Sequence, residues 1–325
     1  MRKIYMLLSL CLFLFTGCDN NSSKAENIDE LSNYISSLDS YELKATMKIN
    51  RSSKEVKSNI VVDYLKPNYY RVSFVNDSNN EQIIIKNDEG VFVLNPSLNK
   101  EFKFDSDWPL NSSHAYILQA VLKDILNDEA STYTLENNVL TVEAKINSKT
   151  NSNLVKMKFY FDVSQKKPIK TVYLNSNNEE KLVVDFISFE PNKSLKTEIF
   201  SKGLVMDEKG NLGEGGTNNE APTITLNVGY IMEGTVLSSS TITDDQSILC
   251  YTGTKSYTIV AEEATVYSTN VIVENFSTYD FVDGGLILVG SNKAKFYYDT
   301  LEVSIYSDEL DVDAFINIAN DIAFE

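Results

Sequence analysis

Histidine, cysteine, tryptophan and basic residues are scarce in this chain. Of its 325 residues one is histidine, three are cysteine and one is tryptophan. A single histidine excludes a metal site built from several histidines, and we expect no histidine-based catalytic triad. The 29 Lys and Arg are outnumbered by 46 Asp and Glu, which gives a net charge of −17. Because neutralising nucleic-acid phosphates requires a basic surface, this balance argues against a nucleic-acid partner.

Motifs that carry catalysis or bind cofactors are also missing. The sequence has no Gly-x-Ser-x-Gly nucleophile elbow and no EF-hand spacing of acidic ligands around a glycine. The glycine pairs at 215–216 and 284–285 do not join a strand to a helix, so they predict no phosphate-binding loop. With no second histidine and no nearby thiol, we expect His114 to be a surface or helix-capping residue. The sequence therefore predicts a protein that is not an enzyme and uses no metal or cofactor.

The first eighteen residues resemble a bacterial lipoprotein signal. Two basic residues at 2–3 precede an apolar run over 4–15, which is shorter than the ~20 residues of a transmembrane helix. The run closes with Phe-Thr-Gly-Cys at 15–18, in which phenylalanine stands where the lipoprotein motif usually has leucine. We expect cleavage between Gly17 and Cys18 and acylation of the Cys18 thiol. An ordinary secretory peptide with an incidental cysteine is the alternative.

This interpretation predicts a protein held by lipidated Cys18 on the extracytoplasmic face of the cytoplasmic membrane. Residues 18–26 are polar and predict a tether rather than a packed element. Cys11 leaves with the signal peptide, residues 1–17, so no intramolecular disulfide can form. The remaining cysteine, Cys250, lies in an apolar strand pattern and is predicted to be buried and unreactive.

Charge divides the rest of the chain into two predicted domains. Residues 18–203 hold 23 basic and 26 acidic residues, a net charge of −3, whereas 204–325 hold 4 and 20, a net charge of −16. Residues 204–220 contain four glycines and no hydrophobic periodicity, which is typical of a flexible linker. We therefore expect one domain over 27–203 and a second over 221–325.

The first domain is predicted to be a large antiparallel sheet with two helices. Apolar residues recur every three or four positions over 28–38 and about 112–127, which predicts helices there. Elsewhere the period is two, and short polar turns between successive strands favour an antiparallel meander. The predicted strands cover 42–49, 58–65, 70–76, 81–87, 90–95, 100–105, 132–136, 139–147, 156–163, 168–175 and 181–190.

A curved sheet of this size has more inward-facing apolar positions than two helices obviously cover. Its concave side is either an ordinary core or a hydrophobic cavity for an acyl chain, and the sequence leaves both open. Trp108 lies where a predicted strand leads into the second helix, and Pro109 favours an extended backbone there. Trp108 is a core residue in one interpretation, and a cavity gate or partner contact in the other.

The second domain is predicted to be a small β-rich unit that ends in a helix. The helix starts at about residue 309, with Ser307 or Asp308 as its N-cap and acidic residues in its first turn. The whole chain is therefore α+β in class and mostly β. The predicted strands of this domain cover 223–229, 231–237, 247–252, 256–260, 270–276, 286–289, 294–298 and 301–306.

The residues around Trp108 resemble the LolA-like lipoproteins of spore-forming Gram-positive bacteria. The resemblance covers about 27–203 and implies an unclosed antiparallel half-barrel with helices as its lid. Two further stretches are similar to a domain of unknown function that accompanies some of these proteins. The matching segments are 64–67, 70–72, 82–85, 90–104, 106–109 and 111–113 in the first domain, and 248–260 and 303–307 in the second.

The resemblance also implies a binding role. LolA-type proteins of outer-membrane systems shelter the acyl chains of lipoproteins, whereas germination lipoproteins of the GerS type bind and activate a cortex-modifying amidase. We therefore expect a membrane-anchored, non-catalytic module that binds a protein partner in sporulation, germination or envelope assembly. An acyl-chain carrier is the alternative, as is a lipid sensor that controls an anti-sigma factor.

Overall fold

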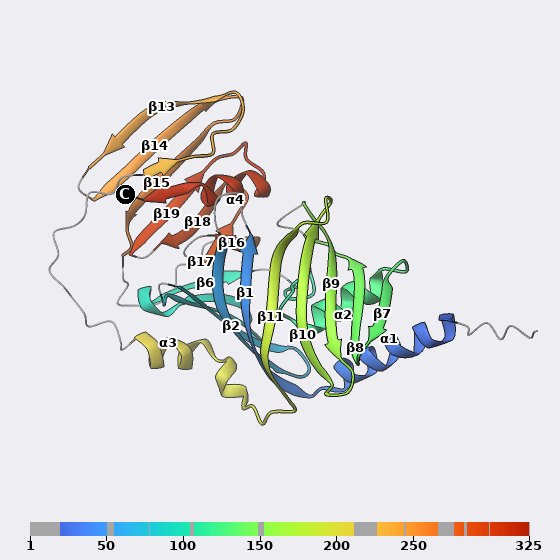
Figure 1. Ribbon diagram of the computed structural model, residues 1–325. Helices are drawn as coiled ribbons and strands as arrows, with labels where there is room; N and C mark the ends of the chain where they lie inside the picture. The colour runs from blue at the N-terminus through green and yellow to red at the C-terminus, as the bar shows by residue number, and fades with distance from the viewer. Residues whose placement is uncertain are drawn as a thin grey trace, which may run out of the picture.

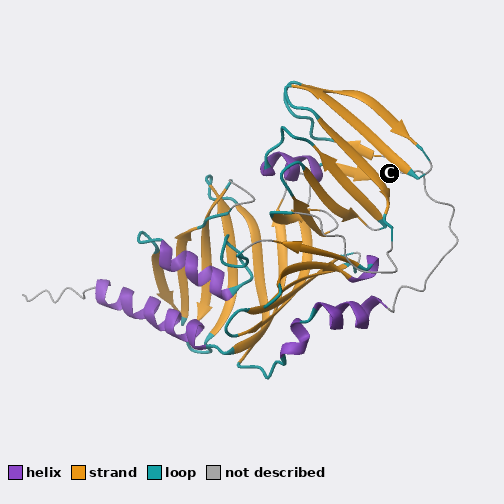
Figure 2. Ribbon diagram, turned by 180° about the vertical axis from the view of Figure 1, so that it is seen from behind, coloured by secondary structure: helices purple, strands orange, loops and turns teal. Residues whose placement is uncertain are grey.

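The protein is built from two large antiparallel sheets, of eleven and seven strands, and a small two-stranded sheet (Figures 1 and 2). The part of the chain that the structure describes also contains four α-helices. It is mostly β, as the sequence predicts. The computed structural model describes residues 20–50, 55–77, 79–104, 107–148, 153–210, 226–243, 245–265, 276–282, 285–298 and 300–324.

The eleven-stranded sheet contains every strand predicted for the first domain. The observed ends lie within three residues of the predicted ones, because the alternation of apolar and polar residues is clear along each strand. The strands are β1 (Ser40–Asn50), β2 (Glu55–Leu65), β3 (Tyr69–Asn76), β4 (Glu81–Asn87), β5 (Gly90–Asn95), β6 (Lys100–Phe104), β7 (Thr132–Glu136), β8 (Val139–Lys145), β9 (Leu154–Asp162), β10 (Lys167–Asn175) and β11 (Glu180–Pro191).

The sheet is unclosed, and its topology explains why a lid crosses it. The strand order is β6-β5-β4-β3-β2-β1-β11-β10-β9-β8-β7, so β1 and β11 pair in the middle and β6 and β7 are the free edges. The chain must therefore pass from one edge to the other. It does so through the crossover segment, residues 107–131, which contains α2 (Leu118–Asn127). Helices α2 and α1 (Asn20–Ser37) lie on the same face of the sheet (Figure 2). Their apolar residues join one core with it.

Both helices differ from their predicted limits. The prediction that α2 starts near residue 112 is wrong, because Ser113 is tied to Asn147: the Ser113 N–H donates to the Asn147 carbonyl, and the Asn147 N–H donates to Ser113 Oγ at 2.8 Å. Conversely, α1 begins at Asn20, inside the predicted tether, because each residue added to an existing helix gains a backbone hydrogen bond. The predicted signal peptide and Cys18 lie outside the described residues.

A third helix, α3 (Lys202–Gly210), occupies the first half of the predicted linker, so that prediction is wrong for residues 204–210. Val205 and Met206 of α3 are buried against the outer face of β4 and β5. On β4, Ile84 faces the concave core while Ile83 and Ile85 lie under α3. The strand is thus buried on both faces, which accounts for its unbroken run of isoleucine. Residues 211–220 of the predicted linker lie outside the described residues.

The seven-stranded sheet has the order β13-β14-β15-β19-β18-β17-β16, and α4 packs against it. The predicted strand at 270–276 falls almost wholly outside the described residues, and β16 was not predicted. The elements are β13 (Thr235–Ile242), β14 (Gln246–Gly253), β15 (Tyr257–Glu263), β16 (Thr278–Val282), β17 (Gly285–Val289), β18 (Lys293–Tyr298), β19 (Leu301–Tyr306) and α4 (Val312–Asn320), with β12 (Leu226–Val228) and β20 (Ile322–Phe324) forming the two-stranded sheet.

Two smaller predictions about this sheet are also corrected. Asp311 caps α4 by accepting a hydrogen bond from the Ala314 N–H at 2.9 Å, whereas the predicted cap Ser307 donates to the Ser256 carbonyl instead. Cys250 is half-buried rather than buried. Its neighbours along β14 point into the core, so strand alternation places the thiol on the opposite face.

The two large sheets pack against each other at what we call the seam, where β16 and β17 meet the concave face of β3 to β6. The Leu286 N–H at the start of β17 donates to Gln82 Oε1 of β4 at 2.5 Å. The preceding residue, Gly285, has a φ of +144°, and a Cβ there would lie 2.2 Å from Gln82 Oε1. Glycine is therefore required at this contact.

We expect Gly285→Ala to lower the free energy of unfolding by about 1–3 kcal/mol, because it strains the backbone and displaces Gln82 from the buried Leu286 N–H. Denaturant unfolding measures the change. Gly203→Ala in α3 is the matched control, because its added Cβ would meet no atom closer than 3.8 Å. This substitution should leave the free energy of unfolding unchanged or raise it slightly. Equal effects of the two substitutions would contradict the seam geometry.

Candidate functional site

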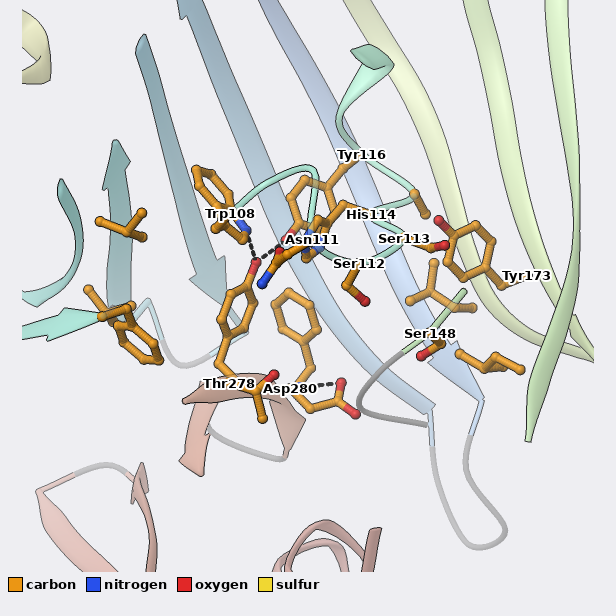
Figure 3. A pocket seen from close by; sticks show the side chains of 18 of the residues that line it. Trp108, Asn111, Ser112, Ser113, His114, Tyr116, Ser148, Tyr173, Thr278 and Asp280 are labelled. Carbon is orange, nitrogen blue, oxygen red and sulfur yellow. Dashed lines mark hydrogen bonds between the residues drawn. The ribbon is translucent and has the colours of Figure 1, made fainter. Parts of the chain in front are cut away.

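A cavity of about 60 Å³ lies at the seam, between the crossover segment, the concave face of the large sheet and β16. Figure 3 shows Trp108, His114 and Tyr116 reaching into it from the crossover segment. Tyr173 faces them from β10, and Thr278 enters from β16. The site is therefore built from three parts of the chain that are far apart in sequence.

Trp108 is fixed in the wall of this cavity by contacts within the chain. Its indole is 2% exposed, and Nε1 donates to the Tyr279 hydroxyl at 2.6 Å. The Tyr279 hydroxyl is also 2.8 Å from the Tyr116 hydroxyl, and the Trp108 ring lies edge-on to Tyr70 at 5.8 Å. The Trp108 N–H and the hydroxyls of Tyr116 and Tyr279 therefore each have a hydrogen-bond partner, as buried N–H and O–H groups require. Trp108 thus contacts this chain's own residues rather than an outside surface.

His114 is enclosed in the same aromatic group, so the prediction of a surface or capping residue is wrong. Its ring stacks on Tyr279 at 5.9 Å with an interplanar angle of 9° and lies 5.9 Å from Trp108. Burial lowers the pKa of His114 to about 3, so the imidazole is neutral at neutral pH. Local sequence could not show this, because the residues that bury His114 include one from β16.

Aromatic side chains of the C-terminal sheet fill much of the concave face. Phe281 of β16 lies 5.0 Å from Phe74 of β3, and Phe276 lies 5.8 Å from Phe102 of β6. Phe276 also forms a parallel bridge with Phe104 at the sheet edge. The cavity left at the seam, about 60 Å³, is well below the ~300–1,000 Å³ of ordinary ligand pockets. It has room for a few water molecules and not for an acyl chain.

A buried ion cluster joins the two sheets beside the aromatic residues. Lys100 of β6, 2% exposed, is hydrogen-bonded to Glu302 of β19, and Lys295 of β18 lies 2.5 Å from the same carboxylate. Burial raises the pKa of Glu302, but the hydrogen bonds from the two lysines outweigh it and hold the pKa below its usual value. The Lys100 ammonium also lies 4.9 Å from the Tyr297 ring centre. This cluster fixes the register of one sheet on the other.

The polar groups of the cavity do not form a catalytic arrangement. The Tyr173 hydroxyl and His114 Nε2 have no hydrogen-bond partner among the described residues. Asp124 of α2 is 7% exposed, and burial raises its pKa to about 6. No group of three His, Cys, Asp or Glu in the described chain could hold a metal ion. The cavity can bind water or a very small polar molecule.

The sequence singled out only part of this site. Trp108 lies in it, and whether its indole acts as a gate remains a prediction; Gly17 and Cys18 lie outside the described residues. The seam residues Tyr279, Lys100 and Glu302 were missed, because each is defined by a partner on the other sheet. The local sequence carries no signal for Lys100, because it is one of three charged residues in the five-residue strand β6.

An open eleven-stranded antiparallel sheet, covered by its own crossover segment and by a second sheet, defines a mostly β protein of the half-barrel class. Residues 1–200 match the family described as sporulation protein YdcC-like. The chain is also 30% identical over 279 residues to the sporulation protein YdcC of Bacillus subtilis, covering 82% of this chain and 80% of that protein. This chain belongs to the YdcC-like sporulation protein family.

Solved structures with the same kind of sheet are more distant. The LolA superfamily protein NE2245 of Nitrosomonas europaea is 13% identical with a TM-score of 0.33, covering 55% of this chain and 98% of its own. A complex of the CwlD amidase with the GerS lipoprotein from Clostridioides difficile is 19% identical with a TM-score of 0.32, covering 51% and 95%.

No helix among the described residues is both long enough and apolar enough to cross a bilayer.

We expect Tyr279→Phe to lower the free energy of unfolding by about 1–3 kcal/mol, because it leaves the buried Trp108 N–H without its acceptor. The emission of Trp108, the only tryptophan, reports the seam directly. Tyr306→Phe is the control, since that side chain is 45% exposed and its substitution should have little effect. If both variants unfold like the wild type, the hydrogen bond does not stabilise the seam.

We expect Asp124→Asn to stabilise the protein at pH 7 by about 1–3 kcal/mol, because the folded state disfavours the ionised carboxylate. A raised pKa gives stability that is fully present below the usual value near 3.8 and is lost as the pH rises through about 6. The gain should therefore disappear at pH 4. Unfolding at both pH values tests this, with exposed Asp29→Asn as the control. A gain of equal size at pH 4 would contradict it.

Proposed function

We propose that this protein is a membrane-anchored, non-catalytic binding module of sporulation or envelope assembly whose ligand is another protein. One observation carries the proposal: the concave face of the half-barrel is occupied by this chain's own β16 and β17. Phe276, Tyr279 and Phe281 are each 9% exposed or less. Surfaces available to a partner therefore lie on the outside of the two sheets.

The absence of a catalytic grouping at the seam supports a binding role. The histidine there is neutral and stacked on Tyr279, and its Nδ1 is 3.5 Å from the Tyr116 hydroxyl rather than next to a carboxylate. The buried ion cluster uses both of its lysines on Glu302. These groups hold the two sheets together and have no free charge to offer a substrate.

The anchor in this proposal is the acylated thiol of Cys18, which follows a short apolar run. One residue separates Cys18 from the start of α1. Two acyl chains at that position would hold the protein on the extracytoplasmic face of the cytoplasmic membrane. The net charge of −16 over residues 204–325 would keep the C-terminal sheet away from anionic headgroups. The name of the family supports a role in sporulation. The resemblance to LolA-like lipoproteins implies a cortex-modifying amidase as the partner.

An acyl-chain carrier is the second candidate, and one observation favours it. A groove of about 630 Å³ runs beside α1, between that helix and strands β8 and β9. Leu31, Tyr34, Leu140 and Phe161 give it a partly apolar lining. Its size falls in the range of ligand pockets, ~300–1,000 Å³, unlike that of the cavity at the seam.

Mass spectrometry of solvent extracts separates the two candidates. The chain from residue 19 onward, without the lipid, is purified, denatured and extracted, with an added fatty acid as the recovery standard. We expect no stoichiometric acyl species, because the concave face is filled and the α1 groove is open to water. One acyl chain per protein would contradict a purely protein-binding role and favour a carrier.

Photo-crosslinking in sporulating cells tests for the protein partner. A crosslinking residue is placed at exposed Ile187 of β11 or exposed Leu237 of β13 in the full-length lipoprotein. We expect a discrete crosslinked protein from at least one position, and no such product from buried Val184. The absence of any product from both exposed positions would contradict the proposal.

A further inference from the structure

The outer edge of the C-terminal sheet is unusually open. Strand β13 is the last strand of the order, so no described strand pairs with its outer side. Its first residue, Thr235, is buried, and the other seven are exposed. Three of these are apolar: Val236 is 65% exposed, Leu237 48% and Ile242 47%. An exposed edge strand offers unpaired backbone N–H and C=O groups to any extended chain that can reach it.

The other three edges of the two large sheets are protected, whereas β13 carries only a register shift between Leu237 and Ser239. Strand β6 carries Lys100, Glu101 and Lys103 and is bridged by Phe276, β16 is docked at the seam, and β7 has only five residues and ends in Glu136. By contrast, β13 reads Thr-Val-Leu-Ser-Ser-Ser-Thr-Ile, with no charge and no proline. Charges and prolines are two usual means of blocking an edge strand, and β13 has neither.

The register of β13 on β14 shows which of its amides point outward. The Thr243 N–H donates to the Gln246 carbonyl at 2.8 Å, so this pair is hydrogen-bonded. Hydrogen-bonded and non-hydrogen-bonded pairs alternate in an antiparallel ladder. The pairs Ile242–Ser247 and Ser240–Leu249 are therefore non-hydrogen-bonded, and the N–H groups of Ile242 and Ser240 point away from β14.

The charge around β13 selects the kind of chain that can bind there. Residues 204–325 carry 4 basic and 20 acidic residues, and Glu233 and Asp245 flank the strand. Lys255, the single lysine between 226 and 265, lies 3.5 Å from the Asp311 carboxylate. A basic segment would be attracted, while a second copy of this chain would bring two strongly acidic sheets together.

We propose that β13 binds an extended, basic segment of a partner protein, which adds to the seven-stranded sheet as its next strand. The proposal rests on the protein-binding function proposed above and names the surface and the chemistry of the partner. Backbone hydrogen bonds to the outward groups of β13 supply affinity, and Val236, Leu237 and Ile242 supply apolar contacts.

Ser240→Pro is the variant that isolates this edge. Proline removes an N–H that points outward, so the ladder with β14 keeps its hydrogen bonds, and edge strands tolerate proline at such positions. Ser240→Thr is the matched control, because it keeps the N–H and favours a strand. Thermal unfolding of both variants confirms that the sheet is intact.

The probe is a fluorescein-labelled ten-residue peptide of alternating valine and lysine, and its counterpart has glutamate in place of lysine. We expect the lysine peptide to bind the wild type and Ser240→Thr equally, and Ser240→Pro at least tenfold more weakly by fluorescence anisotropy. The glutamate peptide should bind at least tenfold more weakly than the lysine peptide. Hydrogen exchange should show new protection of the Ser240 and Ile242 amides when the lysine peptide is bound.

Three results would overturn the proposal: no binding of the lysine peptide, equal binding to the wild type and to Ser240→Pro, or self-association of the wild type through β13 without peptide. The crosslinking experiment distinguishes a failure of the β13 edge site from a failure of the proposed protein-binding function. A partner that is crosslinked equally in the wild type and in Ser240→Pro cells overturns the edge site alone. The absence of any partner overturns the protein-binding function itself.

Discussion

The whole structure depends on one constraint: a strongly curved sheet whose edges, β6 and β7, do not meet. Its concave face is mostly apolar and cannot be left in water without a large hydrophobic cost. Three segments share the work of covering it, namely α1, the crossover segment with α2, and the β16–β17 hairpin of the second sheet. The first sheet therefore completes its core with residues of the second sheet, which also has a separate core of its own with α4.

Polar groups inside the seam give it a single geometry. Apolar contacts alone would allow the sheets to slide, but the Trp108–Tyr279 hydrogen bond and the Lys100–Glu302–Lys295 cluster have partners only in one register. The requirement for glycine at 285 adds a steric constraint at the same place. Burial of charge is costly, and here it is offset by close pairing on a carboxylate that accepts from both lysines.

The sequence predicts secondary structure well, but it does not show which distant segments pack against a residue. The alternation of apolar and polar residues predicted all eleven strands of the large sheet, because within each strand the apolar residues mark the side that faces the core. The same reasoning failed for His114 and for residues 204–210, which form α3, because their surroundings are made by segments that are distant in sequence. Of the site, Trp108 was found because tryptophan is rare in this chain, whereas Tyr279 and Glu302 have no local signature.

The pairing of β1 with β11 in the middle of the large sheet has a consequence for how the chain is made. Tyr41 lies opposite Pro191, so the centre of the sheet cannot form until almost two hundred residues have emerged from the ribosome or from a translocation channel. Until then the segments β1 to β6 and β7 to β10 can form only as two separate meanders, each with one apolar face exposed to water. A nascent chain of this design needs protection from aggregation for most of its synthesis. That need ends when β11 pairs with β1 and joins the two meanders.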